Sequence, residues 1–412
     1  MAESNQAITP LPGMRDLLPP ESHARRKVSE QLQGVFESYG YDLITTPLFE
    51  RVEVFERGLT LDPRDLLRFV EPDGGEVAAL RPDITPQIAR VVSTRLTDFP
   101  LPFRLRYEGT VIRRRRGRAR RQRQIAQVGI ELLGIRGAEA DVEVIRLTAD
   151  ALQAAGLQDF RIELSDVGVA RALIPQELLE IATEPLARKD QTELAKVLEG
   201  VPHLERIAAL AQLHGGLEVI DEAESLVRDT AAAAHVANLR EVAQRLSALG
   251  YGPRLGVDLG EIRGAAYYTG VSFGVFARGP GEALASGGRY DTLLAQYGAP
   301  LPATGAGIDI ENLLAALDAA GLHWRRRDTP RFVIAGADAE SVASQIRAHG
   351  VIASTLTTRD AIQAREYARA WTYDAALLTD GTLTAVRTHD GASQALSKLD
   401  LDALIHWARF IP

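Results

Sequence analysis

The chain has 412 residues, of which 46% are hydrophobic and 25% are charged, and its formal net charge is −8. This length indicates two or three domains, and the composition is typical of a globular protein that does not coat polyanions. The sequence contains no cysteine, which excludes disulfides, thiolate metal sites and thiol nucleophiles. There is no secretory pattern, and no run reaches the roughly 18 apolar residues of a membrane span, so we expect a cytoplasmic protein.

The amino-terminal part predicts two helices separated by short strands. Apolar residues recur at helical spacing from Val28 to Tyr39, and Gly40 ends this helix. The apolar stripe from Ile84 to Leu96 predicts the second helix. Three runs between them predict strands: Leu43–Thr46, Leu66–Val70 and Glu76–Leu80.

The next segment predicts a β-hairpin with strands over Leu105–Ile112 and Ile125–Leu133. The loop between the strands is strongly basic, because eight of the eleven residues from Arg113 to Arg123 are arginine. This cluster is a local exception in an acidic chain.

The returning strand of the hairpin alternates between two kinds of side chain. Gln127, Gly129 and Glu131 share one face, and the apolar residues between them share the other, which we expect to pack on a core. Buried polar groups need hydrogen-bond partners, and Gly129 leaves space for a close neighbour. The polar face therefore either lines a ligand cavity or carries structural hydrogen bonds, and the pattern alone does not choose between them.

After the hairpin we expect a helix over Ala138–Ala155, a strand over Phe160–Leu164, and an almost wholly helical stretch from 168 to 250. This stretch is interpreted as an inserted lobe of four or five helices. Its histidines fall singly, so we expect surface or cap positions and no metal site: His203, His214 and His235.

Strands return over Arg254–Val257, Tyr267–Phe276 and Ala283–Ser286, and a glycine-rich strand then runs into an amphipathic helix before residue 321. The end of the chain predicts a small α/β domain with the strands Arg331–Ala335, Val351–Thr355, Ala375–Leu378 and Leu383–Val386 and the helices Asp338–His349 and Arg359–Trp371. The predicted domains are a core (1–167 and 251–322), the helical insertion (168–250) and the C-terminal domain (330–412).

Six motifs cover roughly residues 10–320: LPGMRDLLPPE, LRPDITPQ, QIAQVGIELLG, IRGAAYYTG, ASGGRYDTLL and TGAGIDIENLL. Their order and spacing are similar to those in histidyl-tRNA synthetases. The chain resembles this family, which implies an α+β fold. It would have the antiparallel-sheet core of class II aminoacyl-tRNA synthetases with a helical insertion, plus the small C-terminal α/β domain. The resemblance also implies a homodimer formed through the core.

The resemblance further implies a histidine-binding pocket on the polar face of the hairpin. The candidate residues are Asp83, Thr85 and Gln127 for the ammonium, Glu131 and Tyr268 for the imidazole, Arg263 for the carboxylate, and Tyr267 and Tyr290 beside them. Carboxylates and an amide suit an ammonium and a ring N–H, and a guanidinium suits a carboxylate. Two positions depart from the family, which has glutamate in place of Asp83 and aspartate in place of Ala266.

The ATP half of the synthetase site departs much further. The family has a glutamate, which accepts the adenine amine, where this chain has Arg115, and a phosphate-binding arginine where it has Asn312. Losing that arginine removes a charge-assisted contact of about 1.5–3 kcal/mol. A guanidinium in place of an acceptor adds a mismatch at the base edge. The two changes together predict that adenylate formation, and hence aminoacylation, is lost.

A core that keeps the amino-acid residues and loses the ATP residues resembles the family of ATP phosphoribosyltransferase regulatory subunits. This implies a non-catalytic subunit in a hetero-oligomer with a short catalytic subunit, which condenses ATP with phosphoribosyl pyrophosphate in the first step of histidine biosynthesis. L-histidine would act as the feedback effector, without a cofactor. Two alternatives remain: an active histidyl-tRNA synthetase, and a tRNA-binding sensor, although the aspartates of the C-terminal domain make nucleic acid binding unlikely.

Three interpretations of the arginine loop stay open. It is a solvated loop, as charge runs usually are, an anion site for a nucleotide, pyrophosphate or an acidic partner face, or a nonspecific RNA contact. The candidate residues for an anion or partner contact are Arg113, Arg114, Arg115, Arg116, Arg118, Arg120 and Arg121.

Overall fold

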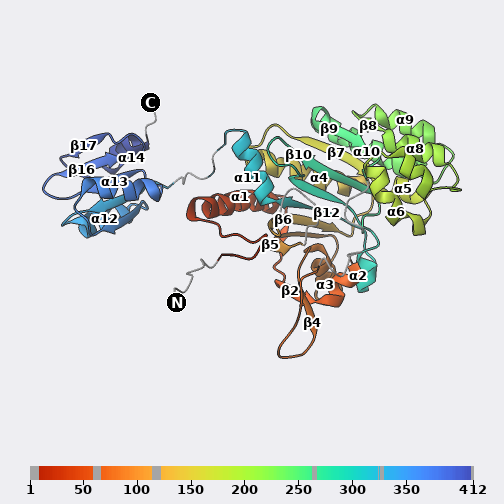
Figure 1. The fold of residues 1–412 in the computed structure, drawn as a ribbon, viewed down its shortest axis with the longest axis horizontal. Coiled ribbons are helices and arrows are strands. Elements are labelled where there is room, and N and C mark those ends of the chain that lie inside the picture. The colour runs from red at the N-terminus through yellow and green to blue at the C-terminus, as the bar shows by residue number, and fades with distance from the viewer. Residues whose placement is uncertain are drawn as a thin grey trace, which may run out of the picture. The chain divides into compact units, whose positions relative to one another are not determined.

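The computed structural model describes residues 9–58, 66–113, 122–261, 267–322, 324 and 329–409. The chain divides into two compact units (Figure 1). The larger unit comprises Met1–Leu17 and Arg25–His323, and the smaller unit comprises Leu18–Ala24 and Trp324–Pro412. Among the described helices, none is long and apolar enough to cross a membrane.

The larger unit is built on a mixed sheet of nine described strands. Their order is β1 (Asp42–Leu43), β5 (Phe103–Ile112), β6 (Gln124–Leu133), β12 (Ala303–Asp309), β11 (Ala285–Arg289), β10 (Val271–Phe276), β7 (Arg161–Asp166), β9 (Leu255–Asp258) and β8 (His214–Gly215). The β1–β5 and β7–β9 pairs are parallel, and the other pairs are antiparallel. The hairpin and the α+β class predicted from the sequence are confirmed.

Helices cover this sheet. They are α1 (Pro19–Ser38), α3 (Thr85–Arg95), α4 (Ala138–Ala154) and α11 (Ile310–Ala319), with the 3₁₀ turns η2 (Gly252–Arg254) and η3 (Leu294–Tyr297). Helix α4 packs across β6, β11 and β12, and α11 packs on β6. The apolar residues of β6 that alternation assigned to a core are fully buried: Val128, Ile130 and Leu132.

A small antiparallel sheet projects from the larger unit beside α3 (Figure 1). It comprises β2 (Phe49–Arg51), β4 (Val77–Leu80) and β3 (Arg68–Val70), with α2 (Val52–Gly58) packed on β4. The strand expected over Leu43–Thr46 is only β1, because Thr46 turns away to bind Gln87 on α3.

The insertion contains six helices rather than the four or five expected. They are α5 (Val167–Leu173), α6 (Gln176–Ala187), α7 (Gln191–Val197), α8 (Leu204–Gln212), α9 (Val219–Val227) and α10 (Ala233–Ala248). His203 occupies the N-cap position of α8, as expected. His235 lies in the first turn of α10, and its side chain is 34% exposed. Its Nδ1 lies 3.1 Å from the carboxylate of Asp166, which is fully buried at the start of α5.

The smaller unit has a five-stranded sheet in the order β14 (Ile352–Leu356), β13 (Arg331–Ala335), β15 (Ala375–Leu378), β16 (Leu383–Arg387) and β17 (Ser393–Leu396). Its helices are α12 (Ala339–Ala348), α13 (Ala361–Ala370) and α14 (Leu401–Arg409). The sequence prediction missed β17, whose residues Ser-Gln-Ala-Leu have little strand propensity. It also missed α14, although Leu404 and Ala408 recur there at helical spacing.

The pair formed by His235 and Asp166 makes stability depend on pH. The hydrogen bond that His235 donates to the Asp166 carboxylate raises the pKa of His235, and burial raises the pKa of Asp166. At His235 the folded chain therefore binds a proton more tightly than the unfolded chain does. This stabilisation is complete below the ordinary histidine pKa of about 6.5 and is lost as pH rises through the raised value. We expect His235→Gln to lower the free energy of unfolding by about 1 kcal/mol at pH 6 and by less at pH 9, measured by urea denaturation.

The matched control is His214→Gln, because His214 lies exposed on β8. It should leave the pH dependence unchanged. An equal loss for His235→Gln at both pH values would contradict the role of the pair.

Candidate functional site

The site begins where the LRPDITP motif starts α3. The Asp83 carboxylate accepts a hydrogen bond from the Thr85 backbone N–H at 3.2 Å, and a proline follows in the first turn, where its missing N–H costs nothing. The same carboxylate accepts from the Tyr267 hydroxyl at 3.0 Å. The start of α3 is therefore tied to the loop before β10. The expected strand Tyr267–Phe276 begins only at Val271, because both tyrosines turn into the site.

Glu131 on β6 is the centre of the cluster and is 1% exposed. The Thr85 hydroxyl donates to one carboxylate oxygen at 2.6 Å, and the Tyr290 hydroxyl donates to the other. On the neighbouring strand, Gly305 lies directly opposite, where a Cβ atom would overlap the Glu131 carboxylate. The glycine of β12 thus makes room for this side chain.

Aromatic rings close the polar face of the hairpin. Tyr267 contacts Tyr268 and Tyr290 edge to face, with ring centroids 5.2 and 5.5 Å apart. Tyr107 on β5 lies opposite Gly129, and its ring fills the space that a Cβ atom at position 129 would need. The close neighbour expected at Gly129 is therefore a side chain of the protein itself, and sequence reasoning missed Tyr107. The cross-strand register of the hairpin was the signal that could have found it.

Burial dominates the electrostatics of the cluster. It raises the pKa of Glu131 to about 8, although the hydrogen bonds from Thr85 and Tyr290 act in the opposite direction. Burial, together with the nearby carboxylate, also holds the pKa of Tyr290 well above its usual range. A carboxyl group that is mostly neutral near pH 7 can donate as well as accept a hydrogen bond.

Gln127 shares the strand face of Glu131 and is half buried. Its side-chain oxygen is buried without a hydrogen-bond partner among the described residues. Such an acceptor is costly to leave unpaired, and it suits a cationic or N–H donor from a ligand.

The rest of the predicted set is divided between described and undescribed residues. Arg263 and Ala266 lie outside the described residues, as do Arg114, Arg115, Arg116, Arg118, Arg120 and Arg121. Arg113 is described at the end of the hairpin, where its side chain donates to the Pro82 carbonyl at 2.7 Å. This contact brings the base of the arginine loop to the residue that precedes Asp83.

Asn312, which the family resemblance aligns with a phosphate-binding arginine, is 2% exposed. Its side-chain amide donates to the Ala283 carbonyl at 2.8 Å, and its backbone N–H donates to the Asp309 side chain, which caps α11. The side chain therefore fastens α11 to the segment before β11. A neutral amide held in this way provides no charge for a triphosphate.

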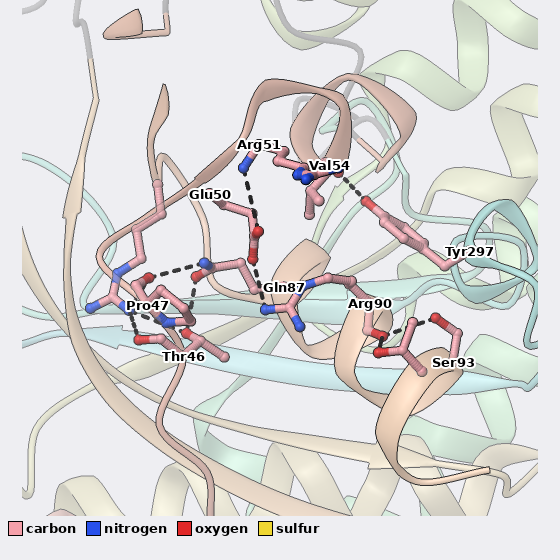
Figure 2. Close-up of polar contacts among 11 residues, drawn as sticks. Thr46, Pro47, Glu50, Arg51, Val54, Gln87, Arg90, Ser93 and Tyr297 are labelled. Carbon is pink, nitrogen blue, oxygen red and sulfur yellow. Dashed lines mark hydrogen bonds and ion pairs between the residues drawn. The ribbon is translucent and has the colours of Figure 1, made fainter. Parts of the chain in front are cut away.

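A buried polar network holds α3 from its other side (Figure 2). Gln87 is fully buried, accepts from the Thr46 hydroxyl at 2.9 Å and donates to the Pro47 carbonyl at 3.0 Å. One turn on, Arg90 forms an ion pair with Glu50 at 2.7 Å. Two successive turns of α3 are thus joined to the segment from 46 to 50, one through Gln87 and the next through Arg90. We therefore expect the helix and this segment to move together.

Arg289 positions Tyr290 and was also missed. It is 7% exposed, donates to Asp141 on α4 at 3.0 Å and to the Gly137 carbonyl at 2.8 Å. The Arg289 charge offsets part of the effect of burial, which still raises the pKa of Asp141 to about 6. This anchor fixes the backbone from which the Tyr290 ring reaches Glu131.

A separate groove of about 490 Å³ lies between the end of α1, β5, α4 and the end of α10. The charged residues in its lining are Arg104, Glu139, Glu143 and Arg146. Arg104 and Glu143 already form a two-pronged ion pair. None of the predicted histidine-site residues lines this groove.

Comparisons with known proteins identify the relatives of this chain. The family model of histidyl-tRNA synthetase matches residues 13–313. An ATP phosphoribosyltransferase regulatory subunit of Geobacter sulfurreducens is 34% identical over 95% of this chain and 94% of its own length. One from Anaeromyxobacter dehalogenans (strain 2CP-C) is 43% identical over 75% of this chain and 91% of its own length.

Solved structures share the fold. A structure from Bacillus halodurans C, described as an ATP phosphoribosyltransferase regulatory subunit/histidyl-tRNA synthetase, has a TM-score of 0.75 and 29% identity over 88% of this chain and 96% of that chain. Histidyl-tRNA synthetase from Nostoc sp. PCC 7120 has a TM-score of 0.73 at 20% identity, which is a likeness of fold alone, over 97% of this chain and 99% of that chain.

The packing of Tyr107 on Gly129 gives a stability prediction. In Gly129→Ala the new methyl group would overlap both the Tyr107 ring and the Ala306 carbonyl, so strand β12 would have to shift. We expect the free energy of unfolding to fall by about 2 kcal/mol or more. The measurement is urea denaturation of the full chain.

Gly34→Ala is the matched control, because Gly34 lies within α1 and nothing lies within 4 Å of its added methyl group. It should stabilise the chain by about 0.5–1 kcal/mol, since alanine favours helix over glycine. Similar effects at both positions would show that the space over Gly129 is not filled.

Proposed function

Because this chain belongs to the family of ATP phosphoribosyltransferase regulatory subunits, a branch of the histidyl-tRNA synthetase fold, we propose that it assembles with a short catalytic subunit and makes that enzyme sensitive to L-histidine. The catalytic subunit joins ATP to phosphoribosyl pyrophosphate, the first step of histidine biosynthesis. This chain contributes control rather than a catalytic group.

The observation that carries the proposal is the contrast between the residues that the family resemblance assigns to histidine and the residue that it assigns to ATP. Glu131 keeps a buried site with hydroxyl partners at Thr85 and Tyr290. Asn312, the residue assigned to ATP, is a buried structural amide. Binding of a small zwitterion is favoured by the first, and ATP activation is disfavoured by the second.

Histidine matches the groups that the resemblance assigns to it. Its imidazole N–H fits the Glu131 carboxyl group, and its ammonium fits the Asp83 carboxylate and the unpaired oxygen of Gln127. Its carboxylate is assigned to Arg263 by the family resemblance.

Feedback requires that histidine binds one conformation of the complex better than another. Thr85 and Tyr290 each donate to one oxygen of Glu131, so a ligand that binds this carboxyl group would share it with these two hydroxyls and shift them. Thr85 is the first residue of α3, and α3 carries the Gln87 and Arg90 contacts to the segment from 46 to 50. A rearrangement at Thr85 would therefore move that segment too.

Two contacts of the assembly belong to the same proposal. A homodimer through the core is supported by apolar side chains left open on outer strands, with Leu43 57% exposed and Phe49 47% exposed. The arginine loop starts at Arg113, beside the site, and would meet an anion or an acidic face of the partner.

Reconstitution tests the proposal. The purified chain is mixed with a short-form catalytic subunit, and phosphoribosyl-ATP is measured with and without L-histidine. We expect activity only in the mixture, and inhibition by histidine. Glu131→Gln should raise the histidine concentration needed for half inhibition at least 10-fold, because an amide nitrogen replaces one of the two oxygens that accept hydrogen bonds at this site.

Glu340→Gln is the control for this experiment, because Glu340 lies exposed on α12 in the smaller unit. The mixture that contains this variant should be half inhibited at the same histidine concentration as the mixture with the unchanged chain. Equal activity of the catalytic subunit with and without this chain would refute the regulatory role.

The enzyme alternative is tested by histidine-dependent exchange of pyrophosphate into ATP. We expect no exchange above background, because Asn312 leaves the triphosphate without its arginine. An active histidyl-tRNA synthetase from another source serves as the positive control. Exchange at a comparable rate would establish a working ligase instead.

A further inference from the structure

Strand β14 forms one edge of the five-stranded sheet in the smaller unit. Its residues are Ile-Ala-Ser-Thr-Leu, without a charge or a proline, and its pairing with β13 runs through five residues without a bulge. Native proteins usually protect an edge strand with lysine, proline or a bulge. An uncharged and regular edge is therefore a site for pairing with another strand.

The direction of its free backbone groups follows from one hydrogen bond. The Ile352 N–H donates to the Pro330 carbonyl, on the side of β13. Since backbone groups alternate along a strand, Ser354 and Leu356 also point to β13, whereas the N–H and C=O groups of Ala353 and Thr355 point outward. No partner for these outward groups is found among the described residues.

Three aromatic side chains, Tyr367, Trp371 and Tyr373, lie beside this edge and are called the aromatic shelf here. The Ser354 hydroxyl donates to the Tyr373 hydroxyl at 2.8 Å, and Leu356 packs on the cluster that contains Tyr373. Tyr367 lies with its ring centroid 6.0 Å from Tyr373 and 6.3 Å from Trp371. Tyr367 is 37% exposed and Trp371 48% exposed, so the shelf is open to contact beside the edge.

We propose that β14 pairs with β14 of a second copy of this chain, antiparallel and centred on Ser354, so that the two sheets become one. In this register Ala353 of each copy faces Thr355 of the other, and their outward groups form four N–H···O bonds. Ile352 faces Leu356 of the other copy, so apolar residues meet apolar residues on the shelf side. A two-fold interface must be self-complementary, and an uncharged strand with apolar residues at equal distances from its centre meets that condition.

The pairing is independent of the proposed function, because it uses neither the histidine site nor the catalytic subunit. It adds a contact between C-terminal units to any dimer formed through the core.

The chain has no cysteine, which allows a clean test by cross-linking. In the proposed register Ser354 faces its own copy as a non-hydrogen-bonded pair, with Cα atoms about 4.5 Å apart, which is within the range of a disulfide. We expect full-length Ser354→Cys to form a covalent dimer under mild oxidation at least 10-fold faster than Ser344→Cys, whose residue is exposed on α12. Non-reducing electrophoresis measures the two rates.

A second variant separates pairing from chance collision. Thr355→Lys, at an exposed position, places an ammonium group on each strand at the edge and should slow cross-linking of Ser354→Cys at least 10-fold. Equal rates for Ser354→Cys and Ser344→Cys, or no effect of the added lysine, would overturn the proposal. Failure of the histidine or reconstitution experiments would leave this result unaffected.

Discussion

A carboxyl group buried against hydroxyl groups is the interaction on which the larger unit is arranged. Glu131 accepts from Thr85 and Tyr290, and each donor is fixed by a different part of the chain. Thr85 is the first residue of α3. Tyr290 follows Arg289, whose side chain donates to Asp141 on α4. The surrounding strands conform to this side chain, since Gly305 supplies its space. A buried carboxyl group without these partners would cost several kcal/mol, so they form one unit.

The sequence predicted local structure well, but it predicted poorly which segments far apart in the chain contact one another. The alternation of β6 assigned Val128 and Ile130 correctly to a core, because successive side chains of a strand point to opposite faces. It left open what covers the opposite face, and there Tyr107 fills the space over Gly129. His235 could not be paired from the sequence, because its partner Asp166 lies 69 residues earlier and meets it only after the insertion folds back.

The residues assigned to ATP and those assigned to histidine differ in how much the sequence alone could say about their roles. Loss of the phosphate arginine is visible at Asn312 as a change of residue type, and the structure adds that the amide is occupied by the Ala283 carbonyl. The histidine assignment came from a family resemblance and not from the alternation, which suited a structural face equally well. The physical feature that motivates the proposed ligand there is the side-chain oxygen of Gln127, which is buried without a partner among the described residues.

The smaller unit carries its hydrophobic core within its own part of the chain. The clusters on its sheet draw only on residues between Phe332 and Ala408. Cooperative unfolding follows a shared core, so the two units need not melt as one. Each unit is then expected to have its own melting temperature, and the buried tyrosine cluster and its carboxyl group should stay folded after the smaller unit has melted.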